Sequence, residues 1–274
     1  KTSLAYSDDV KTRFEGYGWN VTHVTDANDC DAFAKAIRFF QDTPDRPTMI
    51  IVDSHIGYGS PHRQDTKEAH GEALGEEEVR LTKKFYGWPE DAKFLIPDGV
   101  KERFQELMGK RGRTLRDQWM SMFADYKKKY PDLAASLDRM EHRQLPDGWD
   151  KDLPTFPADA KGLATRDSGG KVLNQLAKNI PWLVGGSADL YPSTKTLLTF
   201  DGAGQFEAGS YGGRNFHFGI REHGMGAVAN GMTLSKLRTF ASTFFNFNDY
   251  MKASVRLSAI MEIPVIYVYT HDSI

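Results

Sequence analysis

The first hundred residues alternate between short apolar runs and amphipathic segments, a pattern typical of strands and helices that follow one another in turn. The run Thr48–Val52 lies between turn residues and predicts a buried parallel strand. A shorter strand is expected over Asn20–Val24, and a helix over residues 32–40. Asp29 or Asp31 can cap the free N–H groups of that helix. Strand, helix and strand in this order predict a right-handed crossover in a parallel sheet.

The hydrophobic pattern changes in residues 100–143, where apolar side chains recur every three or four positions within strongly charged segments. This spacing predicts one amphipathic helix around residues 115–126 and a second that begins at Pro131. Residues 145–160 contain three prolines and lack periodicity, which indicates an extended connection between domains. The middle of the chain is therefore expected to be a linker.

From residue 165 onward the alternating pattern returns and predicts a second α/β unit. A glycine-rich loop is expected over residues 193–213. Helices are expected over residues 166–178, 222–232 and 248–261, and strands over residues 182–184, 215–218, 239–244 and 265–269. The predicted fold class is thus α/β, with two partial parallel-sheet domains joined by a helical linker.

Composition narrows the class of protein. The chain of 274 residues is 40% hydrophobic and 26% charged, as in folded globular proteins, and its formal net charge of −2 supplies no field that would recruit nucleic acid or an anionic membrane. The apolar runs are too short to span a bilayer, and no secretory signal opens the chain. The single cysteine, Cys30, excludes an internal disulfide and fits a reducing, cytoplasmic compartment.

The two ends of the chain are unusual. The sequence starts at Lys1 without a methionine and stops directly after a strongly apolar segment, without a closing helix or a polar tail. Processing and arbitrary numbering both account for such ends. The pattern favours an interior slice of a longer protein.

Short motifs of zinc, nucleotide or hydrolase chemistry are absent from the sequence. His55, His62 and His70 are spaced by seven and eight residues, which matches no standard metal site, so no metal ligand is assigned. These histidines follow the carboxyl end of a predicted parallel strand, where α/β sheets bind ligands. With glycines beside them they suit an anion or phosphate contact, although surface histidines without a role give the same pattern.

Glu222 lies where an apolar strand gives way to a helix rich in glycine and alanine. Such a helix packs closely, so we expect the carboxyl at its start to be poorly solvated. Desolvation raises the pKa of a carboxyl in general, whereas a helix N-terminus or a neighbouring arginine lowers it. A glutamate that only caps the helix would give the same sequence pattern.

Two further segments follow predicted strands. Residues 185–190 (Gly-Gly-Ser-Ala-Asp-Leu) bring glycines and an aspartate to a strand end, which suits either a polar ligand or an ordinary turn. Phe244, Phe245, Phe247 and Tyr250 crowd a later strand-to-helix turn. Aromatic side chains at this density are more often part of a core than a platform for a ligand.

Taken together, six segments resemble the transketolases, a family of thiamine-diphosphate-dependent enzymes. The segments are residues 55–61, 69–75, 165–166, 185–190, 220–225 and 269–274, in the order and at separations compatible with the family, and the match covers nearly the whole chain. The resemblance implies that residues 1–100 are the C-terminal part of the diphosphate-binding domain and residues 101–160 a helical and extended linker. Residues 161–274 would then be the N-terminal part of the pyrimidine-binding domain.

The resemblance gives Glu222 the central catalytic role. This residue matches the glutamate that hydrogen-bonds N1′ of the cofactor's aminopyrimidine ring. That bond favours the imino tautomer, whose nitrogen removes the thiazolium C2 proton, and the resulting ylid attacks a ketose carbonyl. Phe244, Phe247 and Tyr250 match the aromatic pocket around the pyrimidine, which reverses the expectation that they are core. We therefore expect Glu222 and Phe247 to face a common cavity.

Further residues match positions that contact the cofactor in the family. Asp189 and Leu190 match residues that line the cofactor, and Ile56 matches one packed beside the thiazolium. His70 matches a catalytic histidine near the diphosphate and the reacting centre. The resemblance thus places cofactor contacts in both halves of the chain.

Arg166, Ser193 and His271 match the residues that hold the phosphate end of the sugar. A guanidinium, a hydroxyl and an imidazole suit an anion. Two positions depart from the family. His223 stands where many transketolases have phenylalanine, and Lys67 stands where a histidine is common, just upstream of the segment 69–75.

The resemblance implies transfer of a two-carbon ketol unit from a ketose phosphate to an aldose phosphate, as in the pentose phosphate pathway and the Calvin cycle. It implies thiamine diphosphate and Mg²⁺ (or Ca²⁺), with metal ligands outside residues 1–274, and a homodimer whose site lies between subunits. A dihydroxyacetone synthase shares these motifs and is the near alternative. A non-catalytic cofactor-binding or interaction fragment is the alternative from another class, since part of the family's site lies outside these residues.

Overall fold

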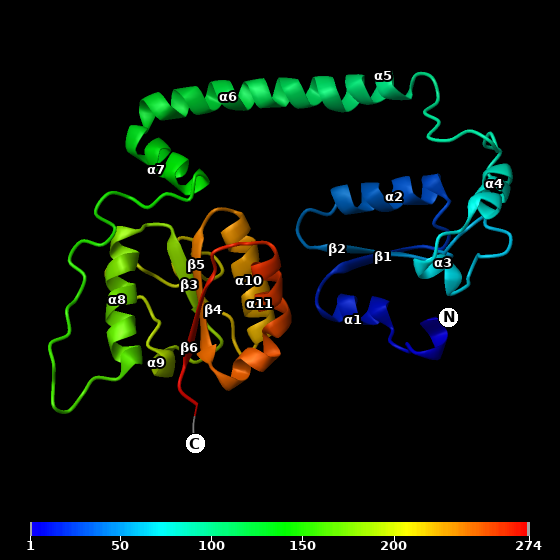
Figure 1. The fold of residues 1–274 in the computed structure, drawn as a ribbon. Coiled ribbons are helices and arrows are strands. Elements are labelled where there is room, and N and C mark those ends of the chain that lie inside the picture. Colours follow the sequence, from blue (N-terminus) through cyan, green and yellow to red (C-terminus); the bar gives the residue numbers. More distant parts are fainter. Residues whose placement is uncertain (1, 273–274) are drawn as a thin grey trace. The chain divides into compact units, whose positions relative to one another are not determined.

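The computed structural model describes residues 2–272, which form two compact units divided between Leu107 and Met108 (Figure 1). Both units contain helices and parallel strands, so the predicted α/β class is confirmed. Ser273 and Ile274, the last residues of the C-terminal motif, lie outside the described residues.

In the first unit, strands β1 (Asn20–Val24) and β2 (Thr48–Val52) pair in parallel. Helix α2 (Cys30–Gln41) connects the two strands. The Asp29 carboxylate caps this helix by accepting a hydrogen bond of 2.9 Å from a backbone N–H in its first turn. The predicted order of strand, helix and strand is thus confirmed, and Asp29 is the cap.

The apolar strand β2 is half-buried along its whole length, so the prediction of a buried strand is wrong. The pattern of residues correctly indicates parallel pairing, but burial depends on what covers the strand. Among the described residues this sheet has two strands, so each of them has one edge without a paired neighbour. An apolar run alone does not reveal how many neighbours a strand has.

The other helices of the first unit are short and were not all expected. They are α1 (Val10–Gly16), α3 (Glu68–Gly71), α4 (Glu76–Phe85) and α5 (Val100–Phe104), with a 3₁₀ turn at Thr2–Leu4. A π-helical segment, Gln105–Lys110, spans the boundary to the second unit. The segment with α3 and α4 includes residues 69–75, which contain His70, one of the predicted site residues.

The second unit begins with the two predicted amphipathic helices, α6 (Arg111–Lys129) and α7 (Pro131–Glu141). Helix α6 has no buried residue within the part of the chain that the structure describes. The rings of Trp119, Phe123 and Tyr126 stack along it, with successive centroids 5.0 and 6.1 Å apart. Its apolar side is therefore exposed.

A four-stranded parallel sheet forms the body of the second unit, in the order β4-β3-β5-β6. Helix α8 lies on one face, and α10 and α11 lie on the other (Figure 1). The strands are β3 (Leu183–Ser187), β4 (Asn215–His217), β5 (Arg238–Phe244) and β6 (Ile266–Thr270). The helices are α8 (Thr165–Asn179), α9 (Tyr191–Thr194), α10 (Glu222–Leu234), the 3₁₀ helix η3 (Asn246–Tyr250) and α11 (Lys252–Ile260).

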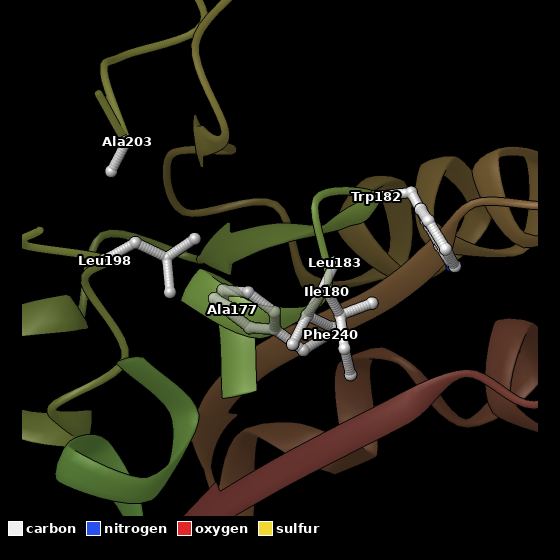
Figure 2. Packing of buried hydrophobic residues seen from close by; sticks show 7 residues of the cluster. All are labelled: Ala177, Ile180, Trp182, Leu183, Leu198, Ala203 and Phe240. Carbon is white, nitrogen blue, oxygen red and sulfur yellow. The ribbon is translucent and has the colours of Figure 1, made fainter. Parts of the chain in front are cut away.

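Strand β5 is covered on both faces because its side chains alternate between two hydrophobic clusters. Phe240 belongs to the cluster on the α8 side, whereas Ala241 belongs to the one against α10 and α11. The first cluster, shown in Figure 2, contains Ala177, Ile180, Trp182, Leu183, Leu198, Ala203 and Phe240. The second contains Ala188, Met225, Ala229, Ala241 and Met251. A rigid central strand therefore leads into the candidate site.

Gly185 and Gly186 lie inside β3, so the expectation that they follow a strand, at a turn or a ligand, is wrong. A Cβ on Gly186 would lie 1.7 Å from the carbonyl oxygen of Phe216 on β4. A Cβ on Gly185 would lie 2.1 Å from the carbonyl oxygen of Phe240 on β5. Both glycines are required because neighbouring strands approach closely.

Candidate active site

The carboxyl ends of all four strands in the second unit lie along one edge of the sheet because the strands run parallel. Ligands of α/β proteins bind at this edge. The site residues predicted for this unit mostly follow these ends: Asp189 and Leu190 after β3, Glu222 after β4, Phe247 and Tyr250 after β5, and His271 after β6. The topology thus brings residues far apart in the sequence to one edge.

Glu222 is the first residue of α10 and is 6% exposed, so the predicted poor solvation of its carboxyl is confirmed. The hydroxyl of Thr243, at the end of β5, donates a hydrogen bond of 3.2 Å to Glu222 Oε1. The carboxyl therefore bonds a side chain of the sheet, which is not the arrangement of a helix cap. Sequence reasoning missed Thr243 because no local pattern links it to a residue 21 positions away.

A pocket of about 730 Å³ opens beside Glu222. Its lining consists of Ile220, Arg221, Glu222, His223, Gly224, Phe247 and Tyr250. Glu222 and Phe247 therefore face a common cavity, as expected. The buried carboxyl and two aromatic rings meet in this pocket.

The aromatic rings at the end of β5 form a series. The rings of Phe244 and Phe247 stack with centroids 5.8 Å apart, and the ring of Tyr250 lies 6.1 Å from that of Phe247. Tyr250 is 68% exposed and Phe247 is 36% exposed, so these two rings are not core residues. An exposed aromatic surface beside a buried acid can receive a planar, partly polar ligand.

Arg166 and His271 meet near the Phe244 ring. Arg166 Nη1 lies 2.8 and 2.7 Å from the two ring nitrogens of His271. The imidazole of His271 lies 5.0 Å from the ring of Phe244, between centroids. Both residues line a second pocket, of about 710 Å³, and Arg166 Nε is buried without a hydrogen-bond partner. An unsatisfied guanidinium donor is available for an anion.

Asp189, Leu190 and Ser193 lie after β3 but line neither of these two pockets. Asp189 is exposed and has a left-handed backbone, with φ of 63°. The Leu190 N–H donates to Ser187 Oγ at 3.0 Å, and Ser193 belongs to the short helix α9. The structure thus brings these three residues to the correct sheet edge without joining them to Glu222 or Arg166.

His70 and Ile56 belong to the first unit. His70 is exposed at the end of α3, and Ile56, which follows β2, is 43% exposed. The loop around Ile56 is held by the Asp65 N–H, which donates to the Ile56 carbonyl at 2.9 Å, and by the Tyr86 hydroxyl, which donates to the Tyr58 carbonyl at 2.9 Å. Ile56 therefore lies on an anchored loop.

Glu78 on α4 also fixes this loop. Its carboxylate accepts a short hydrogen bond from the Ser60 hydroxyl, and others from the backbone N–H of His62 and from His62 Nδ1, each at 2.8 Å. The hydrogen bond from Ser60, followed by those from His62, lowers the pKa of Glu78 to about 2. No sequence signal distinguishes Glu78 from Glu76 and Glu77 beside it, so sequence reasoning missed this residue.

Within residues 2–272, no group of three or more His, Cys, Asp or Glu side chains is placed to hold a metal ion. In the same residues, no helix has the length and apolar character needed to cross a membrane.

Two family models match the chain. Residues 1–146 match the transketolase, thiamine diphosphate binding domain, and residues 161–274 match the transketolase, pyrimidine binding domain. Among curated relatives, a transketolase of Nostoc sp. is 46% identical over 276 residues, covering 100% of this chain and 41% of the relative. One of Bacillus subtilis is 45% identical over 271 residues, covering 98% of this chain and 40% of the relative.

Solved structures agree with these sequence matches. The transketolase of Leishmania mexicana superposes with a TM-score of 0.91 at 34% identity, covering 100% of this chain and 40% of that one. A Pichia stipitis transketolase in complex with sedoheptulose 7-phosphate gives a TM-score of 0.89 at 36% identity, covering 100% and 41%. The chain thus spans about two fifths of the length of these relatives.

Proposed function

The chain belongs to the transketolase family, and we propose that it contributes to the reversible transfer of a two-carbon ketol unit from a ketose phosphate to an aldose phosphate. The observation that carries this proposal is the pocket that joins the buried carboxyl of Glu222 to the rings of Phe247 and Tyr250. Thiamine diphosphate is the proposed cofactor of that pocket.

The residues present fit the pyrimidine part of this cofactor. The Glu222 carboxyl offers a hydrogen-bonding group for a ring nitrogen, and Phe247 and Tyr250 offer aromatic surfaces for a planar ring. When bound, thiamine diphosphate supplies the electron sink that allows a two-carbon unit to leave one sugar and join another.

Each residue near the pocket has a proposed task. Glu222 hydrogen-bonds the pyrimidine nitrogen and holds a proton there, while Thr243 orients its carboxyl from the sheet. Phe244, Phe247 and Tyr250 surround the ring and exclude water. His70 and Ile56, from the first unit, and Asp189 and Leu190, after β3, are the further proposed cofactor contacts, with His70 beside the reacting centre.

Arg166 and His271, with Ser193, are proposed to hold the phosphate of the sugar. The buried, unpartnered Nε of Arg166 and its neighbouring imidazole suit an anion, which favours phosphorylated sugars as substrates. A Pichia stipitis relative is described in complex with a sugar phosphate, which supports this substrate class.

The remaining features of the family are also proposals for this chain. We infer a homodimer with the site between subunits, and Mg²⁺ or Ca²⁺ held by residues outside residues 1–274. A cytoplasmic location rests on the single cysteine, Cys30.

Two alternatives differ in what they predict. A dihydroxyacetone synthase-like ketol transfer would use the same pocket around Glu222 and would differ in the aldehyde that accepts the two-carbon unit. A non-catalytic fragment would have an intact mass near 30.9 kDa, whereas an enzyme of which this chain is about two fifths would have about two and a half times that mass.

The test is an assay of ketol transfer by the full natural chain that contains residues 1–274, first stripped of cofactor and divalent cations. We expect transfer between a ketose phosphate and an aldose phosphate only when thiamine diphosphate and Mg²⁺ are both restored. Transfer that persists without thiamine diphosphate, or failure to bind it, would overturn the proposal.

A further inference from the structure

Two tyrosines of β6 make equivalent hydrogen bonds to different helices. The rings of Tyr267 and Tyr269 stack with centroids 6.3 Å apart and an interplanar angle of 7°. The Tyr267 hydroxyl bonds Asn230 Oδ1 on α10 at 3.0 Å and also lies 3.3 Å from Ser258 Oγ on α11, and the Tyr269 hydroxyl donates to Asn248 Oδ1 on η3 at 2.7 Å. The chemistry is the same, but the two bonds anchor different parts of the unit.

The bond from Tyr269 anchors the rim of the pocket. Asn248 lies on η3 next to Phe247 and two residues before Tyr250, and both of these aromatic residues line the pocket beside Glu222. Neither ring is buried, so packing of the rings alone does not fix their positions. Anchoring of the η3 backbone must therefore contribute.

Other contacts from the end of β6 hold the same segment. The ring of Phe245 meets that of Tyr269 edge-on, with centroids 6.1 Å apart. The backbone N–H of Asn246 donates to Asp272 Oδ1 at 3.0 Å. Tyr269 thus makes two contacts here: its hydroxyl bonds Asn248 on η3, and its ring packs against Phe245, which directly precedes η3.

We propose that Tyr269 is a positioning residue, whose hydroxyl bond to Asn248 holds η3 so that Phe247 and Tyr250 stand beside Glu222 before a ligand enters. The inference rests on the proposed function, because the ligand it serves is the planar ring of thiamine diphosphate. A prearranged site loses less conformational freedom on binding, so its affinity is higher. Tyr269 acts on the pyrimidine pocket through η3: it does not line the pocket beside Glu222, and it lines the second pocket with Arg166 and His271.

The experiment compares Tyr269→Phe with Tyr267→Phe in the full natural chain. Each variant loses one hydroxyl from a half-buried, stacked ring, so Tyr267→Phe is a matched control for general loosening of the sheet. Amide hydrogen exchange of residues 245–250 is measured without cofactor, and the Kd of thiamine diphosphate is measured by titration at a fixed Mg²⁺ concentration.

For Tyr269→Phe we expect exchange in η3 to be about fivefold faster and the Kd of thiamine diphosphate to rise about fivefold, the size of one lost hydrogen bond. kcat at saturating cofactor should stay within about twofold of wild type, because the acid at Glu222 is unchanged. Tyr267→Phe should leave both η3 exchange and Kd near their wild-type values. Asn248→Ala should reproduce the effect, and the double variant Tyr269→Phe/Asn248→Ala should be no worse than either single one.

Equal effects of the two tyrosine substitutions, or no effect of Tyr269→Phe on η3 exchange, would overturn the inference. These outcomes differ from failure of the proposed function, in which the wild-type chain itself would not bind thiamine diphosphate. The exchange measurement needs no cofactor, so it decides the role of the Tyr269 hydroxyl in either case.

Discussion

The hydroxyl of Thr243 donates a hydrogen bond of 3.2 Å to Glu222 Oε1, which connects the end of β5 to the start of α10. Thr243 is fully buried and Glu222 is 6% exposed, so water does not compete for this contact. One oxygen of the Glu222 carboxyl is thus oriented by a buried residue of the sheet, while Glu222 itself lines the pocket. The hydrogen bond from Thr243 therefore fixes the orientation of the Glu222 carboxyl.

The substitution Glu222→Gln should abolish most turnover in the full natural chain. It preserves the shape of the side chain and removes its acidity, and the loss of a general acid or base lowers kcat by about 100-fold or more. Steady-state ketol transfer at saturating cofactor measures the effect, with circular dichroism to check the fold. The exposed Glu262→Gln, which lies outside the pocket, serves as the control. A kcat close to that of wild type would contradict the mechanism.

The substitution Thr243→Val tests whether orientation of the carboxyl matters. Valine fills the same space without the hydroxyl, so Glu222 loses its partner, and we expect kcat to fall about tenfold. Thr239→Val is the matched control, because its buried hydroxyl on the same strand bonds Thr233 and the Ala229 carbonyl instead. That variant should lose stability and keep its turnover. Equal kinetic losses in both variants would show a general effect of destabilisation.

The sequence predicts the elements of this fold where local pattern decides them. The apolar run of β2 and the aspartates at the start of α2 are local signals, and each indicates its element. The burial of Glu222 also follows locally, since glycine and alanine in α10 allow the helix to pack closely. These features need no knowledge of distant neighbours.

Features that depend on distant partners could not be predicted in this way. The glycines of β3 are explained by the carbonyl oxygens of strands that pair with it, and the half-burial of β2 depends on how many neighbours it has. The bond from Tyr269 to Asn248 spans 21 positions, and that from Ser60 to Glu78 spans 18. The family resemblance predicted that Glu222 and Phe247 share a cavity. The aromatic pattern alone would have assigned Phe247 to the core.

Gly186 should tolerate no side chain. A Cβ there would overlap the Phe216 carbonyl oxygen at 1.7 Å, which β4 cannot relieve without breaking its pairing to β3. We expect Gly186→Ala to lower the free energy of unfolding by about 2 kcal/mol or more, measured by chemical denaturation. At Gly231 on α10 a Cβ would meet nothing within 4 Å, so Gly231→Ala should be neutral or stabilise by up to about 1 kcal/mol. Equal destabilisation by both would refute this explanation of the β3 glycines.

The carboxylate of Glu78 should make stability depend on acid pH. Its pKa is lowered from 4.5 to about 2 by hydrogen bonds from Ser60 and His62, so the folded state favours the ionised form. The contribution is present in full above pH 4.5 and is lost as the pH falls towards 2. Glu78→Gln should therefore be less stable than wild type at pH 7, and the difference should shrink between pH 4.5 and pH 2. Denaturation curves at several pH values test this, with the exposed Glu76→Gln as control. A difference independent of pH would exclude the ionised carboxylate as its cause.

Arg166 should make the enzyme bind a phosphorylated ketose more tightly than an unphosphorylated one. Its guanidinium contacts His271 and retains a buried Nε without a partner, so a sugar phosphate would gain a charge-assisted hydrogen bond that an unphosphorylated ketose lacks. We expect Arg166→Ala to raise KM for a ketose phosphate about tenfold or more, while KM for an unphosphorylated ketose hardly changes. The exposed Arg256→Ala on α11, which lines neither pocket, is the control for charge. An equal rise in KM for both donors would mean that Arg166 supports the shape of the site without binding the phosphate.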